Sequence, residues 1–257
     1  MWARYLCAGH FGKAEGMQRW LGLARSLLIY HNPLTIGAWR RFYTQILHPG
    51  DLVFDVGAHV GSRTRAMRRV GARVIALEPQ PLFARYLRLT LPKDVVLIEA
   101  AAGGAETMAE MAVSSRHPTV SSLQSTFVAD AHAAPGFAHV RWDKTETVKM
   151  LTLDSLIATH GLPTYAKIDV EGFELDVLSG LSQAVPMLSV EYLPEFVHLT
   201  EAVITRIEEL GPYQFNPVIG ERSGFLWSDW RDGDGLRNWL ASLPADAPSG
   251  DLFARLP

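Results

Sequence analysis

The sequence predicts an α/β fold, in which a mostly parallel sheet carries helices on both faces, and three observations support this prediction. Short apolar runs alternate with amphipathic segments from Asp51 onward. Each run is apolar at consecutive positions, as in strands that are buried on both faces. A loop with two glycines follows the first run, where open α/β sheets bind ligands. We expect one such domain over residues 51–257, preceded by an N-terminal helical extension over residues 1–50.

The expected elements follow the chain in a simple order. Strands are expected at Leu52–Val56, Val74–Leu77, Val95–Ile98, Tyr165–Val170 and Met187–Glu191, with helices over Ser62–Val70 and Leu82–Leu91. Weaker strands at Met108–Val113 and Thr147–Leu151 flank a polar stretch over residues 114–146, which we interpret as an insert or a long loop. After Gly211 the pattern indicates a strand, a turn, a short helix and a final strand at Asp251–Leu256, which suits an antiparallel hairpin at the sheet edge.

The N-terminal extension contains one helical pattern. Apolar residues recur at helical spacing at Trp20, Leu21, Leu23, Ala24, Leu27 and Leu28, and Asn32-Pro33 is expected to stop the pattern. A helix that caps the core is the favoured interpretation. A substrate lid, an oligomer contact and a membrane-surface helix are the alternatives.

Composition narrows the classes of function. The net charge of -3 gives no general reason to expect nucleic-acid binding, so no nucleic-acid partner is predicted. Four arginines, Arg63, Arg65, Arg68 and Arg69, fall on one predicted helix without interleaved aromatic residues, and we interpret them as a solvated face. The single cysteine, Cys7, favours a reducing compartment, and no apolar run approaches the roughly 20 residues of a membrane span. A cytoplasmic protein without an integral membrane segment is therefore expected.

The loop after the first strand is the first candidate binding element. Asp55 lies at the end of that strand, and Gly57 and Gly61 follow it in a Gly-x-x-x-Gly spacing. The spacing is neither that of a dinucleotide loop nor that of a phosphate loop. An acidic residue before the glycines would repel a pyrophosphate but would suit the cationic amino and sulfonium groups of S-adenosylmethionine. An ordinary strand–turn–helix junction is the alternative.

A second acidic residue strengthens this interpretation. Glu78 ends the second expected strand, 17 residues after Gly61, and Pro79 then turns the chain away. A carboxylate in this place can accept hydrogen bonds from both ribose hydroxyls of an adenosine. The two signals together predict an adenosine site next to a site for a cationic tail.

Three charged residues share one face of a later strand. Strand alternation places Lys167, Asp169 and Glu171 together, with the two acids toward the carboxyl end. Burying three charges costs free energy unless they are paired or functional. We expect them to line the reaction pocket, while a purely structural Lys167–Asp169 pair is the alternative.

These residues resemble the FkbM-type family within the class I S-adenosylmethionine-dependent methyltransferases. Four blocks carry the resemblance: residues 54–61 (FDVGAHVG), 76–79 (ALEP), 151–156 (LTLDSL) and 167–174 (KIDVEGFE). His59 stands where asparagine is more usual in the first block. The resemblance covers about residues 50–192.

The resemblance implies a fold, a cofactor and an activity. It implies a Rossmann-like seven-stranded sheet whose last strand is antiparallel, the cofactor S-adenosylmethionine, and O-methylation of a hydroxyl on a sugar or a natural-product small molecule. The implied cofactor contacts are Asp55, Gly57, His59 and Gly61 near the methionine end, Glu78 at the ribose, Glu99, Ala100 and Ala101 beside the adenine, and Ser122 and Asp169 near the cofactor.

Methyl transfer to a hydroxyl also requires a proton acceptor. Asp169 is the preferred candidate and Glu171 the second, with His117, His132 and His139 of the polar insert as further alternatives. A divalent metal bound by Asp169, Glu171 and Glu191 is conceivable, but the sequence does not define their geometry, so no metal is predicted.

Two other functions compete with this one. A nicotinamide-dependent oxidoreductase lacks its usual glycine motif here, and a non-catalytic binding module has no need of Asp55 and Glu78. The acceptor pocket is expected from residues 1–50, the insert and the tail, where Trp227, Trp230 and Trp239 either stack on the acceptor or fill a small core. An oligomer is possible.

Overall fold

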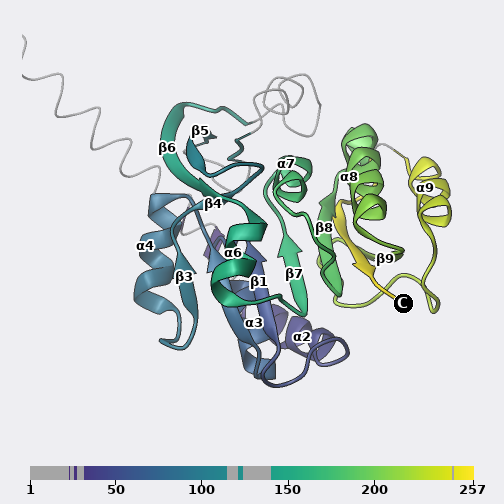
Figure 1. Cartoon of the computed structure of the whole chain (residues 1–257), viewed down its shortest axis with the longest axis horizontal. Coiled ribbons are helices and arrows are strands. Elements are labelled where there is room, and N and C mark those ends of the chain that lie inside the picture. The colour runs from purple at the N-terminus through teal and green to yellow at the C-terminus, as the bar shows by residue number, and fades with distance from the viewer. Residues whose placement is uncertain (1–22, 24–25, 28–31, 115–120, 124–139, 245) are drawn as a thin grey trace, which may run out of the picture.

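The main body of the protein is a seven-stranded sheet in the order β3-β2-β1-β7-β8-β10-β9 (Figure 1). The computed structural model describes the chain except for residues 1–22, 24–25, 28–31, 115–120, 124–139 and 245. The strands are β1 (Leu52–Val56), β2 (Arg73–Leu77), β3 (Val96–Ile98), β7 (Tyr165–Ile168), β8 (Met187–Tyr192), β9 (Gln214–Ile219) and β10 (Gly250–Arg255). The α/β fold predicted from the sequence is therefore confirmed.

The last strand, β10, runs antiparallel to both of its neighbours, as expected. With β9 outermost, β9 and β10 form the antiparallel pair expected at the sheet edge, and β10 lies between β8 and β9 because the chain first crosses to the outer position and then returns. The other hydrogen-bonded pairs of this sheet are parallel. The carboxyl ends of β1, β2, β7 and β8 and the start of β10 therefore meet at one edge.

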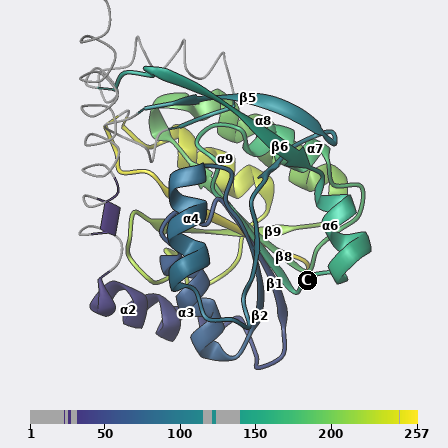
Figure 2. The ribbon, with the colours of Figure 1, turned by 90° about the vertical axis from the view of Figure 1, so that its left-hand side faces the viewer.

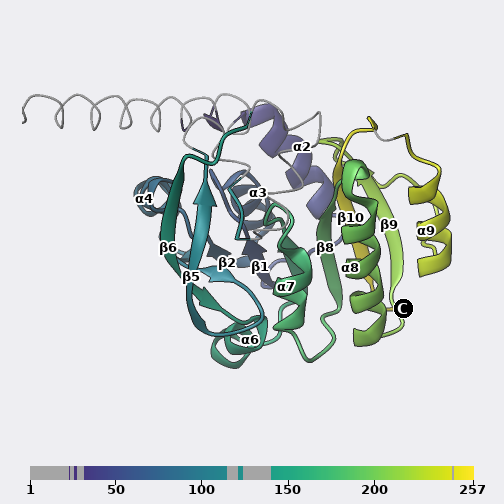
Figure 3. The same cartoon turned by 90° about the horizontal axis from the view of Figure 1, so that it is seen from above.

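Helices cover both faces of the sheet (Figure 3). One face carries α2 (Pro33–Tyr43), α3 (Ser62–Val70) and α4 (Pro81–Thr90), and the other carries α6 (Leu153–His160), α7 (Glu174–Ser179), α8 (Val197–Leu210) and α9 (Gly233–Ala241), with a 3₁₀ turn, η3 (Pro194–Phe196), before α8. Successive residues of β1 serve the two cores: Val53 packs on the α3 side, and Phe54 and Val56 pack on the α7 side. Among the described residues, no helix combines the length and the apolar character needed to cross a bilayer.

A second, three-stranded sheet lies beside the main one (Figures 1 and 2). It contains β4 (Ala101–Ala102), β5 (Thr107–Val113) and β6 (Lys144–Leu151), in the order β4-β6-β5. The two weaker strands predicted here do form, but they pair with each other instead of extending the main sheet. Most of the polar stretch between them lies outside the described residues.

The helix α2 begins at the Asn-Pro pair of the N-terminal segment. Asn32 caps this helix, because its side chain accepts a hydrogen bond from the amide of Leu34 at 2.9 Å, and Pro33 is the first helical residue. The Asn-Pro pair thus begins a helix, and residues 28–31 before it lie outside the described residues, so the stop expected there stays a prediction. Trp39 and Tyr43 of α2 are buried in the core on the α3 side. The boundary predicted at residue 50 stays a prediction.

Of the other residues in the predicted N-terminal helix, Leu23 is buried and Leu27 packs against the same small cluster. Trp20, Leu21, Ala24 and Leu28 lie outside the described residues.

The prediction of a solvated arginine face on α3 is wrong for Arg63 and Arg65. Arg65 is buried and donates to the carbonyl oxygens of Val60 (2.6 Å) and Gly61 (3.0 Å), which stabilises the end of the glycine loop. Arg63 stacks on Trp39 and is described with the site below. The burial of both arginines depends on partners that the helix pattern itself does not reveal.

The two glycines of the β1–α3 loop are required by packing. Gly57 has φ +83°, and a Cβ there would lie 1.9 Å from the carbonyl oxygen of Asp169. Gly61 has φ +74°, and a Cβ there would lie 2.8 Å from Leu87 on α4. Both positions need a left-handed backbone and have no room for a side chain. The loop is therefore held close to the end of β7 and to α4.

We expect Gly57→Ala to lower the free energy of unfolding by about 1–3 kcal/mol, because the new methyl group overlaps the Asp169 carbonyl. The matched control is Gly37→Ala in α2, where no heavy atom lies within 4 Å of the added Cβ, and a gain of about 0.5–1 kcal/mol is expected. Urea unfolding of both variants measures the difference. A Gly57→Ala variant as stable as the wild type would contradict this account of the loop.

Candidate active site

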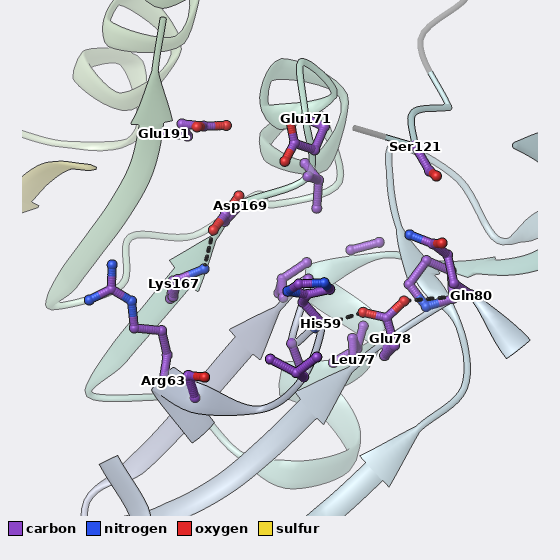
Figure 4. Close-up of a pocket in the computed structure, with 18 of the residues that line it drawn as sticks. His59, Arg63, Leu77, Glu78, Gln80, Ser121, Lys167, Asp169, Glu171 and Glu191 are labelled. Atoms are coloured by element: carbon purple, nitrogen blue, oxygen red, sulfur yellow. Dashed lines mark hydrogen bonds and ion pairs between the residues drawn. The ribbon is translucent and has the colours of Figure 1, made fainter. Parts of the chain in front are cut away.

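A cavity of about 390 Å³ opens at the edge where the parallel strands end (Figure 4). This is the edge at which open α/β sheets bind ligands. The wall includes the β1 loop with Gly57 and His59, Glu78 after β2, Ala100 and Ala101 beside β4, Ser121, and the charged residues Lys167, Asp169, Glu171 and Glu191. Its size falls within the usual range of small-molecule sites.

Glu78 lies at the end of β2 with its carboxylate fixed by backbone amides. One oxygen accepts from the amide of His59 at 2.7 Å, and the other accepts from the amide of Gln80 at 2.9 Å (Figure 4). Burial raises the pKa of Glu78 to about 8, although both backbone hydrogen bonds act in the opposite direction. The carboxylate is thus held in one orientation at the cavity wall and can accept hydroxyl donors.

His59 also lines the cavity. Its φ of +51° is in the left-handed region, which histidine and asparagine tolerate better than most residues. The ring packs edge-on against Phe83, with centroids 4.4 Å apart. Burial lowers the pKa of His59 to about 4, so the imidazole is neutral near pH 7.

Four of the predicted cofactor residues do not line the cavity. Asp55 is fully buried beneath it and accepts a short hydrogen bond from Thr64, and its pKa is raised by burial. Gly61 faces α4, as described above. Ser122 is buried and its backbone pairs with Ala112, while its neighbour Ser121 lines the cavity. Glu99 is exposed and forms an ion pair with Arg88, so it is the adjacent Ala100 and Ala101 that border the cavity.

A buried ion pair sits at the end of β7. The ammonium of Lys167 is 2.7 Å from the carboxylate of Asp169, and the lysine side chain is only 3% exposed. Burial opposes the charged form of Lys167, yet Asp169 and Asp55 raise its pKa above the usual value. Burial likewise opposes ionised Asp169, yet Lys167 holds the pKa of that carboxyl below its usual range. Both groups are therefore charged at neutral pH.

The next turn of the chain is held by Glu174. One carboxylate oxygen of Glu174 accepts from the amides of Val170 and Gly172, each at 3.2 Å. This closes the loop that carries Glu171, whose φ of +55° is in the left-handed region. β7 ends at Ile168, two residues earlier than expected, so Asp169 and Glu171 project from a loop and not from the strand.

Asp169, Glu171 and Glu191 form a cluster of three carboxylates. One oxygen from each lies within 4.8 Å of the others. Burial raises the pKa of Glu171 and of Glu191 well above the usual value, and the neighbouring carboxylates raise both further. The cluster places acceptor-type oxygens at one end of the cavity, opposite Glu78.

Sequence reasoning missed a group of residues that close the far side of the cavity. Arg63 stacks over the ring of Trp39 and pairs with Glu221 at 3.2 Å and with Asp251 at 3.4 Å. The Trp39 indole donates to Glu221 at 3.0 Å. These four residues come from α2, α3, β10 and the loop after β9, so no local sequence motif predicts that they meet.

Several predicted acceptor-site residues lie elsewhere. Trp227 and Trp239 pack edge to face in the C-terminal core, and Trp230 packs against Phe225, so the three tryptophans fill a core and do not line the cavity. The alternative proton acceptors His117, His132 and His139 lie outside the described residues.

Together, the sheet order and the cavity at its carboxyl edge define a Rossmann-like α/β domain with a ligand site. The family model described as the methyltransferase FkbM domain matches residues 55–243, well over half of the chain. The chain therefore belongs to the FkbM methyltransferase domain family. This membership favours a methyltransferase over the nicotinamide-dependent oxidoreductase that the sequence left open.

Individual relatives were also compared. The hexuronic acid methyltransferase AglP from Haloferax volcanii is 30% identical over 150 residues, which cover 58% of this chain and 56% of the relative. The match thus spans only a little over half of the relative's length. Among solved structures, a TehB-like SAM-dependent methyltransferase from Corynebacterium glutamicum has a TM-score of 0.49 at 10% identity, covering 95% of this chain and 97% of the other. Magnesium protoporphyrin IX methyltransferase from Synechocystis PCC 6803 has a TM-score of 0.47 at 10% identity, covering 94% and 91%.

The pKa of Glu78 predicts a pH dependence of stability. Between pH 4.5 and 8 the folded protein keeps a proton on Glu78 that the unfolded chain has released, so the contribution of Glu78 to the free energy of unfolding falls as the pH rises through this window. The negative charges of Asp55 and Asp169 also raise the pKa of Glu78. One pKa unit corresponds to about 1.4 kcal/mol.

We therefore expect the stability of the wild type, relative to Glu78→Gln, to fall by about 1 kcal/mol or more between pH 5 and pH 8. Chemical unfolding across this range measures it. Glu110→Gln, at an exposed position on β5, is the control and should run parallel to the wild type. Parallel curves for Glu78→Gln as well would show that Glu78 ionises normally.

Proposed function

We propose that this protein is an S-adenosylmethionine-dependent O-methyltransferase whose acceptor is a hydroxyl of a sugar. The observation that carries the proposal is the arrangement within one cavity: a backbone-held Glu78 at one end and the three carboxylates at the other. Membership of the FkbM methyltransferase domain family supports the reaction class.

The residues at the Glu78 end fit the adenosine of the methyl donor. Each oxygen of Glu78 already accepts one backbone amide, and its remaining lone pairs can accept the two ribose hydroxyls. Ala100 and Ala101 offer a small, apolar border for the adenine ring. Burial of Glu78 means that these hydrogen bonds form away from water, where they are stronger.

The middle of the cavity fits the methionine end. The loop with Gly57 and His59 lies between Glu78 and Asp169, and the neutral imidazole adds no positive charge beside a sulfonium. Asp55 takes an indirect part in this proposal, because it supports the loop from below through Thr64 on α3 instead of touching the donor. The bound donor supplies an electrophilic methyl group, which it loses to the acceptor oxygen while its sulfonium becomes a neutral thioether.

The carboxylate end fits the acceptor. Lys167 fixes the direction of Asp169, and Glu174 fixes the loop of Glu171, so both carboxylates are positioned before the acceptor enters. When the protein holds the acceptor hydroxyl in line with the methyl group, little further entropy is lost in reaching the transition state of the displacement. Asp169, which stays ionised beside Lys167, or Glu171 takes the proton that the hydroxyl loses.

The acceptor class is supported by the relative and by the chemistry of the wall. AglP is named for hexuronic acid, a sugar acid. Carboxylates are the usual partners of sugar hydroxyls, since each oxygen accepts a directional hydrogen bond. The wall at this end has no exposed tryptophan platform among its described residues, so we propose recognition through hydroxyl groups rather than through ring stacking.

Calorimetric titration with S-adenosylmethionine tests the donor site. We expect the wild type to bind it with micromolar affinity, and Glu78→Ala to lose about 100-fold, since two hydrogen bonds in a buried site are removed. Glu99→Ala is the comparison, because Glu99 is exposed beside Arg88, and its affinity should equal that of the wild type.

Two results of that titration would overturn the proposal. A folded wild type that binds no S-adenosylmethionine would favour a non-catalytic binding module. A wild type that binds NADH in its place would favour an oxidoreductase.

If the protein binds S-adenosylmethionine, the acceptor is identified by adding sugars one at a time and measuring which of them leads to release of S-adenosylhomocysteine.

A further inference from the structure

The three carboxylates at the end of β7 and β8 are brought together from separate parts of the chain. Asp169 follows β7, Glu171 lies in the loop closed by Glu174, and Glu191 lies in β8. Figure 4 shows Glu171 and Glu191 on either side of Asp169, at the cavity wall. Two devices, the Lys167 ion pair and the Glu174 loop, hold this cluster in place, although mutual repulsion opposes it.

Among the described residues, one lysine forms an ion pair with this cluster. Lys167 supplies one positive charge, and its hydrogen bond goes to a single oxygen of Asp169. A separate observation concerns Glu191 Oε2, which has essentially no exposed surface and no hydrogen-bond partner within the described part of the chain. A buried carboxylate oxygen without a partner costs free energy, so its environment is incomplete. A ligand that supplies positive charge at this place would complete it.

We propose that Asp169, Glu171 and Glu191 bind one divalent metal ion with a preference for oxygen ligands, of the Ca²⁺, Mn²⁺ or Mg²⁺ type. The geometry agrees: two oxygens bound to one Ca²⁺ ion at about 2.4 Å are at most about 4.8 Å apart, and the three carboxylate oxygens lie within 4.8 Å of one another. An all-carboxylate donor set suits these ions and not zinc or copper, which prefer nitrogen and sulfur.

In this proposal the bound ion also contacts the acceptor, and this part of the inference rests on the proposed function. Three protein ligands leave further coordination positions open toward the cavity, because Ca²⁺ takes six to eight oxygens. Neighbouring sugar hydroxyls, or a sugar carboxylate, are oxygen ligands of the right kind. The ion also offsets the repulsion that three carboxylates exert on an acidic sugar.

Metal binding can be measured without the methyl donor. We titrate the wild-type chain, freed of metal with a chelator, with Mn²⁺ and count bound ions by electron paramagnetic resonance, and we repeat the titration with Ca²⁺ by calorimetry. One Mn²⁺ per chain is expected, together with a thermal unfolding midpoint that rises with metal concentration. Glu191→Gln should weaken the affinity at least tenfold, and Asp169→Asn should do the same.

Controls keep this test separate from folding and from the donor site. Glu110→Gln, an exposed acid on β5, should bind Mn²⁺ as the wild type does. Glu191→Gln and Glu110→Gln should keep the circular dichroism spectrum of the wild type and its affinity for S-adenosylmethionine measured in chelator. Absence of Mn²⁺ and Ca²⁺ binding at millimolar concentration, or unchanged binding in a folded Glu191→Gln variant, overturns the metal site. If the protein binds the donor but no metal, the metal site is wrong and the proposed function stands. If it binds metal but no donor, the proposed function is wrong and the metal site stands.

Discussion

The interaction on which the site depends is the ion pair between Lys167 and Asp169. Parallel strands that end at one edge bring several acids together, and repulsion among them would push the loops apart. Lys167, buried in β7 on the face that packs toward α3, offsets part of this repulsion from beneath the cavity floor. Gly57 then lets the β1 loop rest directly on the Asp169 carbonyl, so the Glu78 end and the carboxylate end of the cavity share one support.

Arg63, which also lines the cavity, links a second set of residues. Its guanidinium joins Trp39 of α2 to Asp251 of β10 and to Glu221. The antiparallel return of β10 between β8 and β9 brings Asp251 to this position. The cavity wall thus contains two paired cations: Lys167 pairs with Asp169 at the end of its own strand, and Arg63 pairs with acids from β10 and from the loop after β9.

The sheet was largely predictable from the sequence, because strands buried on both faces leave uninterrupted apolar runs such as Leu52–Val56. The same pattern predicted Glu78, Asp169 and Glu171, because acidic residues are unusual at the ends of apolar runs that form buried strands. The residues Arg63, Glu221 and Asp251 were not, since their contacts join segments far apart in the chain. The start of α2 at Asn32-Pro33 was not predicted, because an Asn-Pro pair occurs at both the end and the start of helices. Glu99 and Ser122, which the family resemblance implied, do not line the cavity, but their neighbours Ala100 and Ser121 do, because a resemblance between sequences does not define the direction of a side chain.

A crystal structure of the complex with S-adenosylhomocysteine tests the central claim most directly, namely that the two ends of one cavity separate donor from acceptor. The account predicts both ribose hydroxyls within hydrogen-bond distance of the Glu78 carboxylate, and the sulfur directed toward Asp169 and Glu171. A complex in which the adenosine lies away from Glu78, or in which the sulfur points away from the carboxylate cluster, would contradict it.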